Sequence, residues 1–438
     1  MVADERIAVI GLGYVGLPLA LDLVDAGHRV HAIDADSAKA KRLSSGTSHI
    51  DDIPDERLAA ALAGGRLSVT DTAGGWDDES VAFICVPTPI TPSTQPDLGA
   101  VLSAGAFVRA GLRAGDLVVL QSTTYPGTTM GPLRGVLEES GLRAGTDFGL
   151  AFAPERISPG EGRPASSIPR LAGGIDPAST ERLVAILAAI SPQVTAMSSP
   201  DAAEMAKLFE NVFRNVNIAL VNELALICER LGLDVWEVIA GAATKPFGFM
   251  PFYPGPGVGG HCIPVDPYYL AARAREVGFV ERFVETAGDI NAQMPGHVVD
   301  LVVEALNRQG LPLRGSRLLV VGVAFKPNVA DDRNSPAATI IAGLVEGGAS
   351  VSYHDPHLPS FRPASPGIGG GEPTALASVA LEVALAEPPD CVVIVTPHAT
   401  IDWDAVFATQ SVIVDTRNAS AGRALRPGQV LRLGAGWS

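Results

Sequence analysis

The strongest candidate for a nucleophile in this sequence is Cys262, which follows a stretch of glycine and proline. Every residue of 254–260 except Val258 is Gly or Pro, and this composition excludes a helix and exposes backbone N–H groups that can bind a phosphorylated ligand. A cysteine thiolate is the most nucleophilic side chain near neutral pH. We therefore expect Cys262 to react covalently with a substrate, and a buried, inert thiol is the alternative. The other cysteines fall within strand or helix patterns and are expected to be buried apolar residues: Cys85, Cys228 and Cys391.

A second candidate site is the glycine pattern GLGYVG at 11–16, which fits G-x-G-x-x-G and directly follows a strand-like run. Gly11 allows the tight turn, Gly13 lets the backbone approach a pyrophosphate, and Gly16 permits close packing of helix and strand. Asp34 ends the next strand-like run, where a carboxylate binds the ribose hydroxyls of NAD and repels the 2′-phosphate of NADP. The pattern predicts an NAD site, and a glycine-rich turn without a ligand is the alternative.

A polar stripe lies along a predicted long helix, Asp201–Leu231, which ends at Gly232. Asparagine is a poor helix former, so a solvent-exposed face would accept many better residues. We therefore expect the stripe to form the wall of a site, and a solvated face is the alternative. A helix this long and apolar is also expected to bury against a copy of itself in a homodimer. The stripe residues, roughly on one helical face, are Lys207, Asn211, Asn215 and Asn222.

Lys326 is a further candidate, because it follows a strand-like run at the sheet edge where open α/β folds bind ligands. It shares the loop KPNVADDR with Arg333, which favours a ligand-binding role over that of an ordinary surface lysine. The stretch GVAFKPN at 322–328 has lost the glycine spacing, so we expect no dinucleotide there. His354 and His357 lie in a turn without a cluster of ligands around them, and we expect no bound metal.

Composition places the chain among ordinary globular enzymes. It has 438 residues, of which 47% are hydrophobic and 18% charged, and this excludes intrinsic disorder. The formal net charge of −16 argues against a nucleic-acid-binding surface. The sequence lacks a long apolar leader and long apolar runs, so we expect neither a signal peptide nor a membrane span. The four cysteines lie far apart without a CxxC pair, and the expected location is the reducing cytoplasm.

These candidates must be positioned by two α/β domains. In about the first 190 residues strand-like runs alternate with helical segments, and about the last 125 residues show the same alternation. The runs are almost continuously apolar, which is typical of parallel strands covered on both faces. The predicted fold class is α/β, with two Rossmann-like doubly wound domains joined by a long central helix. The predicted strands are Arg6–Gly11, Arg29–Asp34, Val81–Val86 and Leu117–Ser122, then Arg317–Val323, Ala349–His354, Cys391–Thr396 and Val412–Asp415.

Six motifs occur along the chain in a fixed order. They are GLGYVG at 11–16, STTYPGT at 122–128, PERISPG at 154–160, EMAKLFENVFRNVNIALVNE at 204–223, PGPGVGGHCIPVDP at 254–267 and GVAFKPNVADDRNSPA at 322–337. Together they resemble the UDP-glucose/UDP-mannosamine dehydrogenase family of nucleotide-sugar 6-dehydrogenases, and the resemblance covers essentially the whole chain. It implies an NAD-binding Rossmann domain over 1–195, a central helical dimerisation domain with the cysteine loop over 196–300, and a nucleotide-sugar-binding Rossmann-like domain over 301–438.

Members of this family oxidise the C6 hydroxymethyl of a nucleotide sugar to a carboxylate. The resemblance implies that NAD takes a hydride from C6 and that Cys262 attacks the resulting aldehyde. A second NAD then oxidises the thiohemiacetal to a thioester, which water releases as the acid. A covalent intermediate of this kind divides one difficult reaction into easier steps.

The resemblance also assigns roles to individual residues. Lys207 would stabilise the oxyanions with its positive charge, and Asn211 would add a hydrogen bond there. Asp266 would hold an ordered water together with Thr123, and Glu155 matches the residue of the hydrolysis stage. The expected cofactor contacts are Gly11, Gly13, Tyr14, Val15, Gly16, Asp34, Lys39, Thr88, Ser122 and, at a cofactor phosphate, Arg333. The expected substrate contacts are Tyr253, Gly257, Gly259, Lys326 and Arg417.

The cysteine loop departs from the version typical of UDP-glucose enzymes. Those enzymes carry GGSCFPKD, whereas this chain reads GGHCIPVD at 259–266 after TKPFGFMPFYPGPG at 244–257. This version resembles the branch that acts on UDP-N-acetylhexosamines, particularly UDP-N-acetylglucosamine, and oxidation of UDP- or dTDP-glucose is the alternative. A two-electron β-hydroxyacid dehydrogenase would need neither Cys262 nor Lys326, and a non-catalytic NAD sensor would not need Lys207. The yield of NADH per sugar separates the three: two, one or none.

Overall fold

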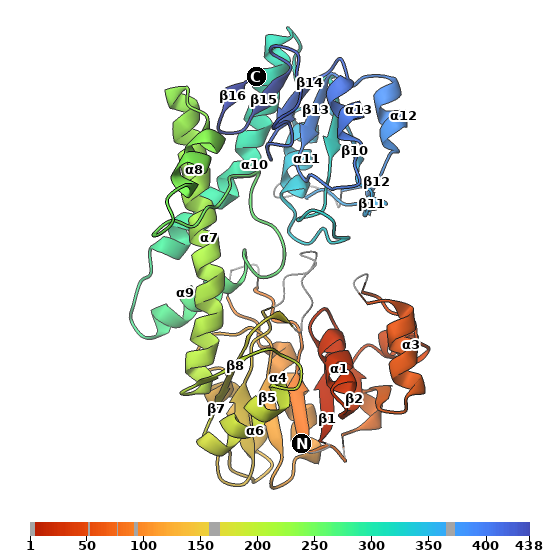
Figure 1. Cartoon of the computed structure of the whole chain (residues 1–438), viewed down its shortest axis with the longest axis vertical. Coiled ribbons are helices and arrows are strands. Elements are labelled where there is room, and N and C mark those ends of the chain that lie inside the picture. The colour runs from red at the N-terminus through yellow and green to blue at the C-terminus, as the bar shows by residue number, and fades with distance from the viewer. Residues whose placement is uncertain (1–4, 51–52, 77, 92–94, 157–166, 365–372) are drawn as a thin grey trace. The chain divides into compact units, whose positions relative to one another are not determined.

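The computed structural model describes residues 5–50, 53–76, 78–91, 95–156, 167–364 and 373–438 (Figure 1). The chain divides into two compact units. The first comprises residues 1–211 and 265–280, and the second comprises residues 212–264 and 281–438. The division falls inside helix α7 (Pro200–Leu231), the long helix expected from the sequence, so this helix contributes residues to both units.

The first unit is formed around an eight-stranded sheet in the order β3-β2-β1-β4-β5-β6-β7-β8. The strands from β3 to β6 are parallel, whereas β7 pairs antiparallel with β6. The strands are β1 (Arg6–Ile10), β2 (Arg29–Asp34), β3 (Leu67–Asp71), β4 (Val81–Ile84), β5 (Leu117–Leu120), β6 (Gly149–Phe152), β7 (Arg170–Gly174) and β8 (Val194–Met197). The helices are α1 (Gly16–Asp25), α2 (Ser37–Ser44), α3 (Asp55–Ala63), α4 (Gly99–Gly111), α5 (Arg134–Glu138), α6 (Pro177–Leu187) and α9 (Asp266–Glu276).

Both faces of this sheet are buried. In β1, Ile7 and Val9 belong to one apolar cluster, whereas Ala8 and Ile10 belong to another. Successive side chains of a strand point to opposite faces, so the two clusters lie on opposite sides of the sheet. A parallel sheet needs this double cover because its crossover helices lie on both faces. The doubly wound domain predicted from the continuous apolar runs is thereby confirmed.

The second unit repeats the architecture with a six-stranded sheet in the order β10-β9-β13-β14-β15-β16. Its strands are parallel except β16, which pairs antiparallel with β15. The strands are β9 (Arg317–Val321), β10 (Ser350–His354), β13 (Cys391–Ile394), β14 (Val412–Asp415), β15 (Val430–Arg432) and β16 (Gly436–Trp437), with a separate pair β11 (Ser360–Phe361) and β12 (Leu376–Ala377). The helices are α8 (Val235–Ala243), α10 (Phe283–Arg308), α11 (Pro336–Glu346), α12 (Leu381–Ala386) and α13 (Trp403–Ala408). Within the described ranges, no helix is both long and apolar enough to span a membrane.

In each sheet the strand order reverses once, between β1 and β4 in the first and between β9 and β13 in the second. Loops that follow the carboxyl ends of parallel strands meet at one sheet edge, and open α/β sheets bind ligands there, at the reversal. The pattern GLGYVG follows β1, and Ser122 follows β5. In the second unit, Lys326 follows β9 and Arg417 follows β14. The topology therefore brings predicted site residues to the ligand-binding edge of each sheet.

Candidate functional site

The turn after β1 has the geometry of a dinucleotide-binding turn. Gly11 has a φ of 92°, and its N–H donates to the Ile33 carbonyl of β2 at 2.8 Å. A Cβ on Gly16 would lie 1.9 Å from the Gly11 carbonyl oxygen, so only glycine fits there. A Cβ on Gly13 would meet nothing within 4 Å. No contact within the described residues therefore requires glycine at position 13. A backbone without a side chain at this position instead leaves room for a pyrophosphate to approach closely.

Asp34 links the carboxyl end of β2 to this turn. Its carboxylate accepts hydrogen bonds from the Leu12 N–H at 2.8 Å, the Asp36 N–H at 2.9 Å and Lys39 Nζ at 3.1 Å. The carboxylate is thus fixed where the ribose hydroxyls of NAD would bind. The remaining predicted cofactor positions of this unit lie in the loops after β1, β4 and β5: Tyr14, Val15, Thr88 and Ser122.

The second unit has an equivalent turn, but the carboxylate at this turn forms its hydrogen bonds within the protein. The Gly322 N–H donates to the His354 carbonyl at 2.8 Å, as Gly11 does to Ile33. Asp355 takes the place of Asp34, and its side chain and that of His398 are fully buried 3.0 Å apart. Burial raises the pKa of Asp355, but the hydrogen bonds outweigh this effect and lower it to about 2. The backbone N–H groups that also bond to this carboxylate are those of Val323, Ala324, His357 and Leu358.

Lys207, Asn211 and Asp266 form a buried cluster in the first unit. Asn211 Nδ2 donates to Asp266 Oδ2, and the three residues are 8%, 6% and 3% exposed. Burial raises the pKa of Asp266 to about 6, although the charge of Lys207 and the bond from Asn211 act in the opposite direction. Charged groups are rarely buried unless they are paired or functional. This part of the polar stripe is therefore not a solvated face.

The packing of α9 against α7 holds Asp266 in this cluster. Leu208 of α7 and Tyr269 of α9 are both fully buried and belong, with Val265, to one small apolar cluster. The Tyr269 hydroxyl donates to the Pro89 carbonyl at 2.9 Å in the loop after β4. The helix that begins at Asp266 is therefore fixed on one side to α7 and on the other to a loop at the ligand-binding edge.

Glu155 follows β6 at the same edge and is held by a buried ion pair. Its Oε2 lies 3.1 Å from both Arg170 Nη1 and Gln121 Nε2. The side chains of Arg170 and Glu155 are 4% and 10% exposed, and a buried guanidinium gives a carboxylate a fixed orientation. Thr123, after β5, is half-buried. Of the PERISPG motif, residues 157–160 lie outside the described residues.

Glu204 is a residue that sequence reasoning missed. It is fully buried on α7, where its carboxylate accepts the Gly127 N–H at 2.8 Å and both the N–H and the hydroxyl of Thr129, at 2.9 and 2.7 Å. Burial raises its pKa to about 7 despite these bonds. Glu204 thereby anchors the segment that follows Ser122 and Thr123. The available signal was an acidic residue one helical turn before Lys207, within the motif EMAK.

The glycine loop before Cys262 (residues 254–260) packs closely within the second unit. A Cβ on Gly255 would lie 2.5 Å from Nη1 of Arg417, and a Cβ on Gly259 would lie 2.7 Å from Cβ of Phe325. Only residues without a side chain allow the loop this close approach. The loop therefore contacts two segments that were predicted to bind substrate, the one after β14 and the one after β9.

Three cationic side chains predicted to bind ligands lie in this unit. Burial lowers the pKa of the Arg417 guanidinium to about 10, which still leaves it charged at neutral pH. Lys326 is half-buried in the loop after β9. Arg333 is exposed and pairs with Asp331 through Nε at 2.9 Å. The other predicted contacts are Gly257 and Gly259 in the glycine loop and Tyr253, whose ring stacks on Trp236 with 6.1 Å between centroids.

The four cysteines differ in burial. Cys85, Cys228 and Cys391 are buried, whereas Cys262 is partly exposed. Burial raises the pKa of all three buried thiols, that of Cys391 to about 12. Such thiols do not form thiolates near neutral pH, and the prediction that they are buried apolar residues is confirmed. Cys262 belongs to the second unit, and the cluster of Lys207 belongs to the first.

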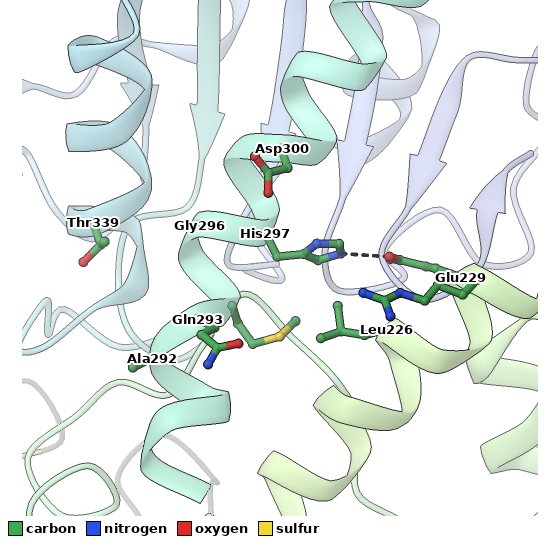
Figure 2. A pocket seen from close by; sticks show the side chains of 10 residues that line it. Leu226, Glu229, Ala292, Gln293, Gly296, His297, Asp300 and Thr339 are labelled. Carbon is green, nitrogen blue, oxygen red and sulfur yellow. Dashed lines mark ion pairs between the residues drawn. The ribbon is translucent and has the colours of Figure 1, made fainter. Parts of the chain in front are cut away.

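A hollow of about 580 Å³ lies among α7, α10 and α11 of the second unit (Figure 2). Two of its lining side chains, Glu229 and His297, point toward each other with Oε2 and Nε2 2.9 Å apart. The described residues that line it include none of the predicted catalytic or binding residues. Across the described parts of the chain, no group of three or more His, Cys, Asp and Glu side chains is placed to hold a metal ion.

Three domain models of a single family match successive parts of the chain. The family is the UDP-glucose/GDP-mannose dehydrogenase family. Its NAD binding domain matches residues 5–191, its central domain residues 201–293 and its UDP binding domain residues 319–421.

Individual relatives give the same result. The chain is 38% identical to the UDP-N-acetyl-D-glucosamine 6-dehydrogenase of Pseudomonas aeruginosa, over 81% of this chain and 83% of the relative. It is 34% identical to the UDP-N-acetyl-D-mannosamine dehydrogenase of Pyrococcus horikoshii, over 94% and 95%. The solved structure of the UDP-D-ManNAc dehydrogenase from Pyrococcus horikoshii matches with a TM-score of 0.87 at 33% identity, over 98% and 99% of the two chains. A UDP-glucose dehydrogenase from Pyrobaculum islandicum matches with a TM-score of 0.82 at 29% identity, over 100% and 99%.

Proposed function

The chain belongs to the UDP-glucose/GDP-mannose dehydrogenase family, and from this premise we propose that it oxidises the C6 hydroxymethyl of a UDP-N-acetylhexosamine to a carboxylate with NAD. It is an NAD-dependent oxidoreductase of nucleotide sugars. The relatives named for UDP-N-acetyl sugars support this substrate class, and UDP- or dTDP-glucose is the alternative. The observation that carries the proposal is the packing of the glycine loop, which leads into Cys262, against Arg417 and Phe325.

The parts of the chain divide the work in this proposal. Residues 1–195 bind NAD, the acceptor of the hydrides that leave C6. Residues 196–300 carry the cysteine loop and the dimer interface, and residues 301–438 bind the nucleotide sugar. Because the chemistry needs a reduced thiol at Cys262, we place the enzyme in the reducing cytoplasm.

The chain's own residues then carry the covalent chemistry. Loss of the first hydride from C6 to the cofactor, and of the hydroxyl proton to water, leaves an aldehyde. The thiolate of Cys262 attacks it, and the carbonyl oxygen takes up the negative charge, which Lys207 and Asn211 stabilise. Loss of a hydride from this adduct leaves a thioester. Water, held by Asp266 together with Thr123 and activated by Glu155, attacks the thioester carbon. Cleavage of the C–S bond then releases the acid and restores the thiolate.

The stoichiometry of NADH tests this function. A panel of UDP-N-acetylglucosamine, UDP-N-acetylmannosamine, UDP-glucose and dTDP-glucose, each followed by NADH absorbance, should give two NADH per sugar for the true substrate. A four-electron oxidation requires that ratio, whereas a two-electron dehydrogenase gives one. A ratio of one with free aldehyde as product would contradict the proposal, and so would no turnover of any nucleotide sugar.

Asp34 should set the cofactor preference. Its carboxylate occupies the position of the 2′-phosphate of NADP, so the wild type should prefer NAD strongly. In Asp34→Ala the repulsion is removed and Lys39 loses the carboxylate it bonds to at 3.1 Å. The ratio of kcat/KM for NADP to that for NAD should rise by about 100-fold, close to 3 kcal/mol.

A matched control for this test is Asp71→Ala. Asp71 ends the neighbouring strand β3 and accepts a bond from Ser37, so its loss should leave the cofactor ratio unchanged. Equal efficiency of the wild type with both cofactors would contradict the role of Asp34.

The proposed enzyme is a homodimer that associates along α7. Phe213, Leu220 and Ile227 recur every seven residues, so they share one helical face, and they are 41%, 59% and 47% exposed. Large apolar side chains gathered on one face mark an interaction surface. Light scattering should therefore give twice the chain mass at micromolar concentration, and the double variant Leu220→Glu with Ile227→Glu should be monomeric. A fully active wild-type monomer would contradict this assembly.

A further inference from the structure

Two asparagines of the polar stripe, Asn215 and Asn222, have no part in the proposed chemistry, yet both are buried. They are 4% and 0% exposed, and a third asparagine, Asn291 of α10, is 7% exposed. The three side chains form a continuous chain of hydrogen bonds. Asn222 Nδ2 donates to Asn291 Oδ1 at 2.9 Å, and Asn291 Nδ2 donates to Asn215 Oδ1 at 2.9 Å.

This series of hydrogen bonds ends on the backbone of the glycine loop. Asn222 Oδ1 accepts the Gly255 N–H at 3.0 Å. A backbone N–H can only donate, so it fixes the oxygen of Asn222 toward the loop and the nitrogen toward Asn291. The same logic orients Asn291 toward Asn215. The Gly255 N–H therefore determines the orientation of the Asn222 amide, which in turn determines that of Asn291. Each hydrogen bond in the series strengthens the next one.

A second contact between α10 and the loop involves the same helical face. Pro295 lies four residues after Asn291, which places the two side chains on one face of α10. A Cβ on Gly257 would lie 3.3 Å from Cγ of Pro295. The loop is thus held at Gly255 through the asparagines and at Gly257 by the proline ring. A buried polar group without its partner is unfavourable, so the loop has one preferred position.

We propose that Asn291 is a positioning residue: through Asn222 it fixes the glycine loop, and thereby the geometry in which the nucleotide sugar and Cys262 are presented. The inference rests on the proposed function for its kinetic consequence only. Neither Asn291 nor Asn222 contacts the reacting atoms in this scheme. Their effect is transmitted through the backbone of residues 255–257.

Two substitutions at Asn291 distinguish positioning from space filling. Asn291→Leu keeps the branched shape but removes the acceptor that Asn222 needs. Asn291→Asp keeps that acceptor, and its carboxyl group, which burial keeps neutral, donates through its hydroxyl to Asn215 as the Asn291 amide does. We expect amide exchange of a peptide covering residues 251–261 to be about tenfold faster in the leucine variant, the factor that one lost buried hydrogen bond produces. KM for the nucleotide sugar should rise by about the same factor while KM for NAD stays unchanged, and the aspartate variant should lie within about threefold of wild type.

Asn307→Leu, on the exposed side of the same helix, is the matched control and should leave both measurements unchanged. Loop exchange in Asn291→Leu equal to that of wild type would overturn the proposal, and so would an aspartate variant as impaired as the leucine variant. If Asn291→Leu does not fold, Asn215→Ala interrupts the chain at its far end and should speed loop exchange by about threefold. Exchange needs no substrate, so a failed proposed function and a failed positioning role give different results.

Discussion

Replacing Cys262 by serine should lower the rate of acid formation by at least about 10³-fold, or 4 kcal/mol of barrier. A serine hydroxyl is far harder to ionise than a thiol, and an alkoxide is a poorer leaving group than a thiolate. The variant should still bind the nucleotide sugar, because the glycine loop, Lys326 and Arg417 are unchanged. Mass spectrometry of the variant with substrate and NAD should show either released aldehyde or an ester on the new serine.

Cys85→Ser is the control for this experiment. Cys85 is 7% exposed within an apolar cluster, so its replacement should lower the melting temperature and leave the NADH yield at two. Near-native acid formation by Cys262→Ser, with two NADH per sugar, would show that the covalent mechanism is wrong.

Replacing Lys207 by methionine should lower kcat by about 10²- to 10³-fold, the loss that follows removal of one oxyanion-stabilising group. Methionine keeps the length of the side chain and removes its charge. Lys207 is 8% exposed, and a charge in a buried site is weakly screened, so its loss has a large effect. KM for NAD should change little, because the turn at Gly11 and Asp34 is intact. Lys41→Met, on the exposed side of α2, should leave kcat unchanged.

The pH profile gives an independent check on this cluster. The pKa of Asp266 is raised to about 6 from 3.8, so its protonated form is the one that the folded state favours. Stability from this group is complete below about pH 4 and is lost as the pH rises through about 6. Activity should depend on pH in the opposite direction. The rate should fall below about pH 6, in an acidic limb of the profile, because protonation removes the negative charge of Asp266. Asp266→Asn should be less active at every pH and should lack that limb. A wild-type limb that persists in this variant would assign it to another group.

Local features of the cofactor site could be predicted from the sequence because the pattern and its partners lie close together. The turn at 11–16 and Asp34 are separated by one helix, and the hydrogen bond from Leu12 to Asp34 spans 22 residues. The apolar runs likewise predicted every strand near the reversal of strand order in each sheet. A parallel strand is buried on both faces, so nearly all of its residues are apolar and the strand can be recognised from its own sequence.

Hydrogen-bond partners that lie far away in sequence could not be found this way. Glu204 bonds to Gly127 across 77 residues, and Asn222 bonds to Asn291 across 69. On a single sequence Glu204 reads as an ordinary charged helix residue and Asn291 as an ordinary polar one. Only the packing of α7 against its neighbours gives them buried partners. The motif EMAK places Glu204 near Lys207 but does not indicate its bonds to Gly127 and Thr129.

The histidines of the HDPH turn illustrate a different limit. The sequence raised a metal site there and rejected it for lack of a ligand cluster. The residue of interest lay between them: Asp355 binds the backbone of the Gly322 turn and contacts His398. No pattern indicated this, because the glycine spacing that would reveal a relationship to the first turn had been lost.

The two turns have different freedom to change. Asp34 is held by two backbone N–H groups and by Lys39, and in the proposed function it also contacts the cofactor, so cofactor selectivity in the first unit depends on one side chain that a single mutation can replace. Asp355 is bound by its own backbone, and the second turn keeps its shape whatever the surrounding loops recognise. The exposed positions of the loops after β9 and β14 can therefore be changed without disturbing the sheet, whereas Val323, Ala324 and Ser420 bond to the buried carboxylates at its edge. A library aimed at a new nucleotide sugar would randomise these exposed positions and keep Gly322, Asp355 and His398 constant.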